Sequence, residues 1–140
     1  MLIKAKKVSV GATIPTRKRD SDAGWDLSSL ERERITGNSV KLVRTGIALE
    51  IPTGYYGLLR ARSGFAVDFQ MGVTAGVIDS EYRGEVRIAV MNPTQRPFTI
   101  EPGERIAQII ITKLPSTEMK EVTELGESDR GEKGFGSSGK

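Results

Sequence analysis

Apolar and polar residues alternate in short runs along this chain, which is the pattern of strands that pack one face and expose the other. Residues 86–90, V-R-I-A-V, form one such run, and turn signals such as P-T-G at residues 52–54 separate the runs. Strands are expected over residues 2–8, 40–44, 47–51, 55–60, 86–92 and 105–114. Many short strands at this spacing are typical of an all-β sandwich, jelly roll or barrel.

One short helix is expected after Ser63, because its hydroxyl can cap a helix in which Phe65, Ala66 and Phe69 form an apolar stripe. No long amphipathic helix is evident elsewhere in the pattern. Residues 116–125 fit either a helix or a strand, and both alternatives stay open.

The composition changes near the C-terminus. Residues 1–125 are expected to form one domain, whereas residues 126–140 hold five glycines, three serines and a single large apolar residue, Phe135. Such a tail cannot bury enough surface to fold alone, so we expect it to be flexible. Its last residues, G-F-G-S-S-G-K, fit most of a Walker A loop, but the strand and helix that a Walker A loop requires are missing. Glycine N–H groups and serine hydroxyls can still bind an anion.

The chain contains no cysteine and no histidine. Disulfides, thiol nucleophiles, Cys/His zinc sites and histidine-based triads are therefore excluded. Any proton chemistry must rest on carboxylates, tyrosines, lysines or water. An oxygen-preferring cation such as Mg²⁺ is the metal that this composition favours.

Basic residues crowd the first nineteen positions, and no acid precedes Asp20. They could contact nucleic acid or polyphosphate, but we favour a basic edge strand that resists edge-to-edge pairing. The few aromatic residues also argue against a base-stacking surface, so we expect no nucleic-acid partner. No apolar run approaches the length of a membrane span, and the N-terminus lacks a signal-peptide pattern, so we expect no membrane association and an intracellular location.

Residues 76–84 read G-V-I-D-S-E-Y-R-G. Val77 and Ile78 favour an extended, packed backbone, while the bracketing glycines permit tight turns or close approach of a ligand. We expect a rigid, hairpin-like loop that holds Asp79 and Tyr82 at fixed positions. A plain surface hairpin with solvated charges fits this segment equally well when it is taken alone.

Five patches along the chain carry a resemblance: D-A-G-W-D-L-S-S (22–29), R-S-G-F-A (62–66), G-V-I-D-S-E-Y-R-G (76–84), G-E-R-I-A-Q-I-I (103–110) and R-G-E-K-G-F-G-S-S-G (130–139). In order and spacing they closely resemble the five motifs of the trimeric dUTP pyrophosphatases (dUTPases). Ala61 stands where that family usually has proline, and Ser138 where it usually has threonine; both keep the chemistry.

The resemblance implies a jelly-roll-like β-barrel with a short helix and a flexible C-terminal tail, assembled as a homotrimer with shared active sites. It implies a cytoplasmic enzyme, with the nucleus or a virus-infected host cell as alternatives. That enzyme would hydrolyse dUTP to dUMP and pyrophosphate with Mg²⁺, supplying dUMP and keeping uracil out of DNA.

The resemblance also implies roles for the loop. Asp79 would orient and deprotonate the attacking water and touch the region of the sugar 3′-hydroxyl. Tyr82 would lie flat under the deoxyribose and leave no room for a 2′-hydroxyl. The backbone of Gly76, Val77 and Ile78 would bind the uracil edge in a slot too tight for a 5-methyl group.

The remaining implied residues surround the triphosphate. Arg62, Ser63 and Gly64 would bind the α- and β-phosphates at the helix start. Asp26 and Gln108 would hydrogen-bond the waters of a Mg²⁺ that the triphosphate holds, with no direct protein ligand. In the tail, Arg130 would neutralise phosphate charge and Phe135 would stack on uracil. The γ-phosphate would be wrapped by Gly136, Ser137 and Ser138.

Two other functions are compatible with parts of this pattern. A dCTP deaminase, or a bifunctional deaminase–dUTPase of the same fold, would need a further glutamate base and a different arginine–serine motif. A non-catalytic jelly-roll module that binds a protein partner would have no need of Asp79, Tyr82 and the tail together. Hydrolysis of dUTP is therefore the function that the sequence favours.

Overall fold

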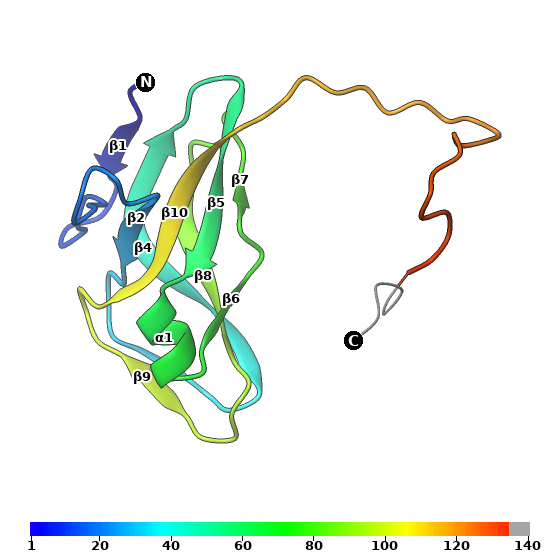
Figure 1. Ribbon diagram of the computed structural model, residues 1–140. Coiled ribbons are helices and arrows are strands. Elements are labelled where there is room, and N and C mark those ends of the chain that lie inside the picture. The colour runs from blue at the N-terminus through cyan, green and yellow to red at the C-terminus, as the bar shows by residue number, and fades with distance from the viewer. Residues whose placement is uncertain (135–140) are drawn as a thin grey trace.

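The computed structural model describes residues 1–134 and is built mainly from two four-stranded antiparallel sheets (Figure 1). In spatial order the first sheet contains β1 (Lys4–Lys7), β4 (Ser39–Glu50), β8 (Glu85–Asn92) and β6 (Gly72–Thr74). The second contains β2 (Gly24–Ser28), β10 (Arg105–Lys113), β5 (Tyr55–Ala61) and β7 (Val77–Ile78). A two-stranded sheet of β3 (Glu33–Ile35) and β9 (Phe98–Ile100) and one helix, α1 (Ser63–Asp68), complete the fold.

Both sheets contribute apolar side chains to one buried core. Its fully or almost fully buried members from the strands include Leu27, Val43, Ile47, Leu59, Val86, Ile88, Val90, Ile106 and Ile109. Burial of these aliphatic groups supplies the main stabilisation of a fold with a single short helix. The predicted all-β architecture is confirmed.

The two strands expected over residues 40–44 and 47–51 form the single strand β4. A shift in the β4–β8 register between Arg44 and Ala48 accommodates the intervening residues, with Gly46 at φ +67°. The sequence predicts an extended backbone at Val77 and Ile78, which form β7, but it does not predict β2, β3, β6 and β9. Each of these has five residues or fewer, which is too short for a period-two pattern to stand out.

The predicted helix is present, but the expected cap is wrong. The N-cap is Arg62, no side chain caps the helix, and Ser63 is already the first helical residue. The expected apolar stripe is also only partly correct. Phe65 is buried and Ala66 is exposed, while Phe69 packs against Phe98 with ring centroids 5.1 Å apart. The six-residue helix thus rests on one buried phenylalanine.

Strand β1 lies at the edge of its sheet, and all four of its residues are exposed. Lys4 bonds Glu50 of the neighbouring strand at 2.8 Å. The prediction of a basic edge strand is confirmed. Within residues 1–134, no helix combines the length and apolarity needed to cross a bilayer.

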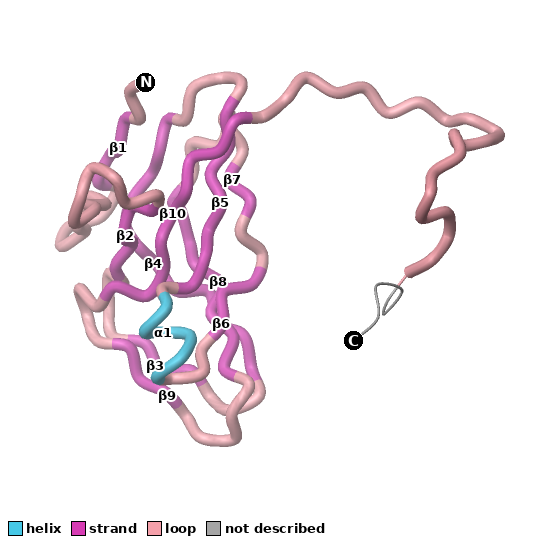
Figure 2. The backbone as a smooth tube through the Cα atoms, viewed as in Figure 1, coloured by secondary structure: helices cyan, strands magenta, loops and turns pink. Residues whose placement is uncertain are grey.

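Residues 115–134, which we call the arm, run away from the barrel after β10 (Figures 1 and 2). The stretch 116–125 is neither helix nor strand, so both alternatives left open by the sequence are excluded. Met119 and Leu125 are 100% and 90% exposed, so the arm presents apolar side chains without covering them.

Candidate active site

Asp26 of β2 lies at the centre of a charged cluster. Its Oδ1 is 2.9 Å from Nε of Arg62, and its Oδ2 accepts a hydrogen bond from Nη1 of Arg105 at 3.1 Å. Gln108 of β10 is its direct partner in the β2–β10 register. We call Asp26, Arg62, Arg105 and Gln108 the Asp26 cluster. Three of these were predicted site residues; Arg105 was not singled out, although it lies in the G-E-R-I-A-Q-I-I patch.

Gly24 on β2 has no side chain, and this leaves room for the side chain of Gln108. A Cβ at Gly24 would lie 2.1 Å from Oε1 of Gln108, so the amide side chain lies directly over the Gly24 backbone. Nε2 of Gln108 also reaches the carbonyl of Ala61 on β5, at 3.5 Å. The amide thus belongs to the direct cross-strand partner of Asp26.

The predicted phosphate-binding residues adjoin this cluster. Arg62 connects β5 to α1, and Ser63 and Gly64 follow it as exposed residues in the first turn of the helix. Arg62 also donates from Nη1 to the carbonyl of Arg105 at 3.3 Å. The structure therefore brings Arg62, Ser63 and Gly64 to the end of the sheet where Asp26 and Gln108 lie.

Residues 76–84, which we call the tyrosine loop, are fastened to β5. The amide of Leu59 donates to the carbonyl of Gly76 at 2.7 Å, and Ile78 faces Gly57 in the β5–β7 register. A Cβ at Gly76 would lie 2.8 Å from the Leu59 carbonyl oxygen, so only glycine permits this close approach. A loop is present, but the expected hairpin is wrong: β7 pairs with β5 in one sheet and β8 pairs with β4 and β6 in the other, so residues 76–84 connect the two sheets.

Two further hydrogen bonds shape the outer part of the loop. The Tyr82 amide donates to the Asp79 carbonyl at 3.1 Å, and the Tyr82 hydroxyl donates to the carbonyl of Glu85 at 3.0 Å. Both Asp79 and Tyr82 remain exposed to solvent. The loop thus combines a fixed backbone with accessible chemical groups.

Asp79 and Tyr82 share one cavity of about 290 Å³, which we call the tyrosine pocket. Its lining consists of Leu42, Val77, Ile78, Asp79, Tyr82, Glu85 and Arg87. Burial alone would raise the pKa of the Glu85 carboxyl, but the Gly46 amide and the guanidinium groups of Arg44 and Arg87 outweigh burial and lower that pKa. The pocket therefore holds one accessible carboxylate, Asp79, and one firmly ionised carboxylate, Glu85.

The Asp26 cluster and the tyrosine pocket lie apart in a single chain. Strands β2 and β7 are the two edges of one sheet, in the order β2-β10-β5-β7. Their backbones are three strand spacings apart, or about 14 Å. The structure therefore gathers the predicted site residues into two groups and does not join the groups within one chain.

The tail contributes to neither group in the described part of the chain. Nε of Arg130 donates to the carbonyl of Lys133 at 2.8 Å, inside a local turn of the arm. Phe135, Gly136, Ser137 and Ser138 lie outside the described residues. Among residues 1–134, no group of three or more His, Cys, Asp or Glu side chains is arranged to hold a metal ion.

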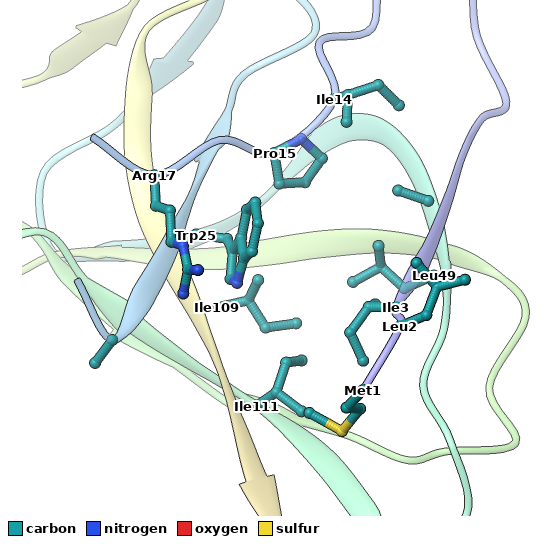
Figure 3. Close-up of a pocket in the computed structure, with 12 residues that line it drawn as sticks. Met1, Leu2, Ile3, Ile14, Pro15, Arg17, Trp25, Leu49, Ile109 and Ile111 are labelled. Carbon is teal, nitrogen blue, oxygen red and sulfur yellow. The ribbon is translucent and has the colours of Figure 1, made fainter. Parts of the chain in front are cut away.

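A larger, apolar pocket of about 410 Å³ lies elsewhere, between the N-terminal segment and strands β2 and β10 (Figure 3). Its lining consists of Met1, Leu2, Ile3, Ala5, Ile14, Pro15, Arg17, Ala23, Trp25, Leu49, Ile109 and Ile111. Figure 3 shows Arg17 beside the Trp25 ring, with the guanidinium carbon 4.7 Å from the ring centroid. None of the predicted site residues lines this pocket, so size alone does not identify the site.

A family model described as dUTPase matches residues 11–139. The chain is 42% identical over 144 residues to the deoxyuridine 5′-triphosphate nucleotidohydrolase of Nautilia profundicola, with 100% of both chains covered. The protein of the same name from Debaryomyces hansenii is 43% identical over 134 residues, which covers 94% of this chain and 84% of that relative.

Solved structures of dUTPases are also similar to this chain. A mutant dUTPase of Staphylococcus bacteriophage 80alpha with dUpNHpp has a TM-score of 0.91 at 32% identity, covering 99% of this chain and 98% of that chain. A mutant dUTPase of phage phi11 of S. aureus, described as revealing the coordination of a structural Mg(II) ion, has a TM-score of 0.83 at 26% identity, covering 89% of this chain and 98% of that chain. These similarities extend over the same patches that form the Asp26 cluster and the tyrosine loop, and the chain belongs to the dUTPase family.

Proposed function

We propose that this chain hydrolyses dUTP to dUMP and pyrophosphate, supplying dUMP and keeping uracil out of DNA. Membership of the dUTPase family over residues 11–139 supports this proposal. The structural observation that carries it is the tyrosine pocket, in which Asp79 and Tyr82 line one cavity. A water-activating carboxylate and a ring that can lie against a sugar are thus available at the same place.

Asp79 is proposed as the general base. It would accept a proton from a water that attacks the α-phosphorus in line. A new bond forms between that water oxygen and the α-phosphorus, while the bond to the oxygen that bridges to the β-phosphate breaks. Pyrophosphate leaves with this oxygen, and dUMP retains the new one.

Tyr82 and the start of the loop are proposed to select the nucleoside. The Tyr82 ring would lie under the deoxyribose and occupy the space that a 2′-hydroxyl needs. The backbone of Gly76, Val77 and Ile78 would bind the uracil edge and exclude a 5-methyl group. The close fit of Gly76 against Leu59 supports a slot of fixed width, because neither backbone can move apart without losing their 2.7 Å hydrogen bond.

The triphosphate is proposed to lie at the Asp26 cluster, where Arg62, Ser63 and Gly64 begin α1. Asp26 and Gln108 fit a hydrated Mg²⁺, because carboxylate and amide oxygens accept hydrogen bonds from metal-bound waters. When bound by the triphosphate, Mg²⁺ would neutralise its charge and orient the phosphates. In the free chain Arg62 lies 2.9 Å from Asp26, so phosphate oxygens would compete with this carboxylate for the guanidinium.

A homotrimer is proposed to complete the site. The positions of Asp26 on one edge strand, β2, and of the tyrosine loop after the other edge strand, β7, support this, because a cluster from one chain can meet a tyrosine loop from another. The arm, which runs away from the sheets of its own chain, also supports it (Figure 1). In this arrangement the tail residues Phe135, Gly136, Ser137 and Ser138 would reach a neighbour's substrate.

The proposed function is tested by measuring pyrophosphate release from dUTP, dCTP, dTTP and UTP under identical conditions with Mg²⁺. Hydrolysis of dUTP with little release from the other three is expected. Comparable rates for UTP and dUTP would contradict the assigned role of Tyr82. Ammonia release from dCTP, measured in parallel, would instead favour a deaminase.

A further inference from the structure

Glu85, the first residue of β8, is held on several sides. Its side chain is 10% exposed, and its Oε1 accepts a hydrogen bond from the Gly46 amide at 2.8 Å. Nε of Arg44 lies 3.2 and 3.1 Å from the two carboxylate oxygens, and Nε of Arg87 is 3.4 Å from Oε2. Charge-assisted bonds of this kind fix the position of a carboxylate.

A bulge in β4 explains why a carboxylate is suited to this place. Arg44 faces Arg87 while Ala48 faces Glu85, so four steps along β4 match only two along β8. Gly46 lies inside this bulge at φ +67°, and its amide points to the Glu85 carboxylate. A side-chain acceptor therefore satisfies a backbone donor that the bulge removes from the regular ladder.

Main-chain atoms of Glu85 and of the preceding Gly84 hold the Tyr82 side chain. The Tyr82 hydroxyl donates to the Glu85 carbonyl at 3.0 Å. A Cβ at Gly84 would lie 2.4 Å from Oη and 2.5 Å from Cζ of Tyr82, so the phenol lies directly against the Gly84 backbone. Tyr82 and Glu85 both line the tyrosine pocket with Asp79.

We propose that Glu85 is a positioning residue for Tyr82. The clamped carboxylate fixes the start of β8 and therefore the Glu85 carbonyl, and this carbonyl fixes the phenol ring. Glu85 acts only through Tyr82 and touches no reacting atom. The inference rests on the proposed function, because the ring position matters there for the choice between deoxyribose and ribose.

The first test compares Glu85→Gln with Glu50→Gln. Glu50 is a matched control, because it belongs to β4 of the same sheet and bonds a cross-strand lysine, Lys4, at 2.8 Å. Loss of one hydrogen-bonded constraint predicts that Glu85→Gln lowers the ratio of kcat/KM for dUTP to that for UTP by about fivefold. Glu50→Gln is expected to leave the ratio unchanged. An unchanged ratio in folded Glu85→Gln would overturn the proposal, even if its Tm falls.

A double-mutant cycle tests whether the effect passes through the phenol. Tyr82→Phe removes the hydroxyl that bonds the Glu85 carbonyl. If Glu85 acts through this bond, adding Glu85→Gln to Tyr82→Phe should change the dUTP/UTP ratio little further. Fully additive effects would overturn the proposal.

A readout that needs no activity separates this inference from the proposed function. The chain has three tyrosines, so 3-fluorotyrosine labelling gives three ¹⁹F signals, of which Tyr82→Phe removes one. Glu85→Gln should shift or broaden the Tyr82 signal, and Glu50→Gln should not. An unaltered Tyr82 signal would overturn the inference. If Glu85→Gln shifts the Tyr82 signal but the wild-type protein does not hydrolyse dUTP, the ring-positioning role is supported and the proposed function is contradicted.

Arg44→Met provides a second variant should Glu85→Gln fail to fold. It removes the guanidinium at 3.1 Å and leaves the carboxylate with the Gly46 amide and with Nε of Arg87. The same change in the Tyr82 ¹⁹F signal and in the dUTP/UTP ratio is expected. Arg44→Lys should restore part of both, because a cation again faces the carboxylate. Arg44→Met that keeps both the signal and the ratio of the wild type would overturn the proposal.

Discussion

The Asp26 cluster and the tyrosine loop are held in place by different kinds of contact. Asp26 bonds Arg105, which is 79 residues away in the chain, and it pairs with Gln108 across two strands. Tyr82 instead bonds residues three positions before and after it, Asp79 and Glu85. The cluster therefore exists only once the sheet has formed, whereas the loop is a local unit fastened to β5.

This difference matches the proposed roles, in which the cluster binds phosphates and the loop selects the nucleoside. A cluster of long-range ion pairs offers charge for phosphates, and its arginines can exchange one anion for another. A short loop with a fixed backbone offers a defined shape, which is what the proposed selection of base and sugar requires. Because β2, which carries Asp26, and β7, which begins the tyrosine loop, are opposite edge strands of one sheet and about 14 Å apart, a change at Asp26 should have little direct effect on the loop.

The largest effect is expected for the base in the tyrosine loop. Asp79→Asn should lower turnover by about a hundredfold or more while leaving Tm and dUTP binding nearly unchanged. Glu81, an exposed carboxylate two residues further along the same loop, gives a matched control, since Glu81→Gln also removes one charge there. Steady-state kinetics and calorimetry check both variants. Turnover of Asp79→Asn within a few-fold of wild type would contradict its role as general base.

Removal of the tail should have the next largest effect. Deleting residues 126–140 should spare folding and assembly but lower turnover by about tenfold or more, because site closure is lost. Phe135→Ala in the full chain should cause much of the same loss. Activity assays and sedimentation measure the two properties separately. A truncated chain as active as the full chain would show that neither region of the site needs the tail.

A smaller effect is expected at the Asp26 cluster. Gly24→Ala places a methyl group where Oε1 of Gln108 lies, only 2.1 Å away, and should displace this amide. We expect turnover to fall by roughly tenfold or less while the dUTP/UTP ratio stays constant, because the tyrosine loop is untouched. Gly72→Ala is the control, since the one tight contact of its new methyl group, at 3.1 Å, is with the flexible end of the Met91 side chain. A changed sugar preference in Gly24→Ala would show that the two regions are not separable.

The smallest expected effect concerns acid stability at Glu85. Its pKa is lower in the folded chain than the ordinary value of 4.5, so it contributes stability that is present above pH 4.5 and is lost as the pH falls through the folded pKa. The Tm difference between wild type and Glu85→Gln should therefore be largest near neutral pH and shrink below pH 4.5. Glu50→Gln should show a smaller difference, because its ion pair with Lys4 is exposed. A Tm difference that grows on acidification would contradict this account of Glu85.

The sequence predicted the local features of the molecule better than the long-range ones. Alternation identified the longer strands, and the bracketing glycines of residues 76–84 indicated the loop, since both depend on neighbouring residues. The Arg105–Asp26 pair could not be predicted, because nothing in either segment reveals the register of β2 against β10. The bulge at Gly46, where β4 has two more residues than the matching part of β8, could not be predicted for the same reason.

The helix cap shows a different limit. Ser63 is a favoured capping residue, yet the chain enters the helix one position earlier, at Arg62, whose guanidinium lies 2.9 Å from Asp26. The preference of serine for the N-cap position was thus not followed, and the residue that takes this position instead, Arg62, forms an ion pair with Asp26. The roles of the site residues were carried by resemblance alone, and they stay predictions.

The central claim is that one chain's Asp26 cluster works with another chain's tyrosine loop. It is tested most directly by mixing Asp26→Asn chains with Asp79→Asn chains, each expected to be nearly inactive alone, and refolding them together. If sites are shared between chains, about a quarter of the sites in randomly mixed trimers should carry both native carboxylates, and activity should rise far above that of either variant. If the mixture stays as inactive as the separate variants although mixed trimers form, each chain must use its own Asp26 and Asp79, and the account is contradicted.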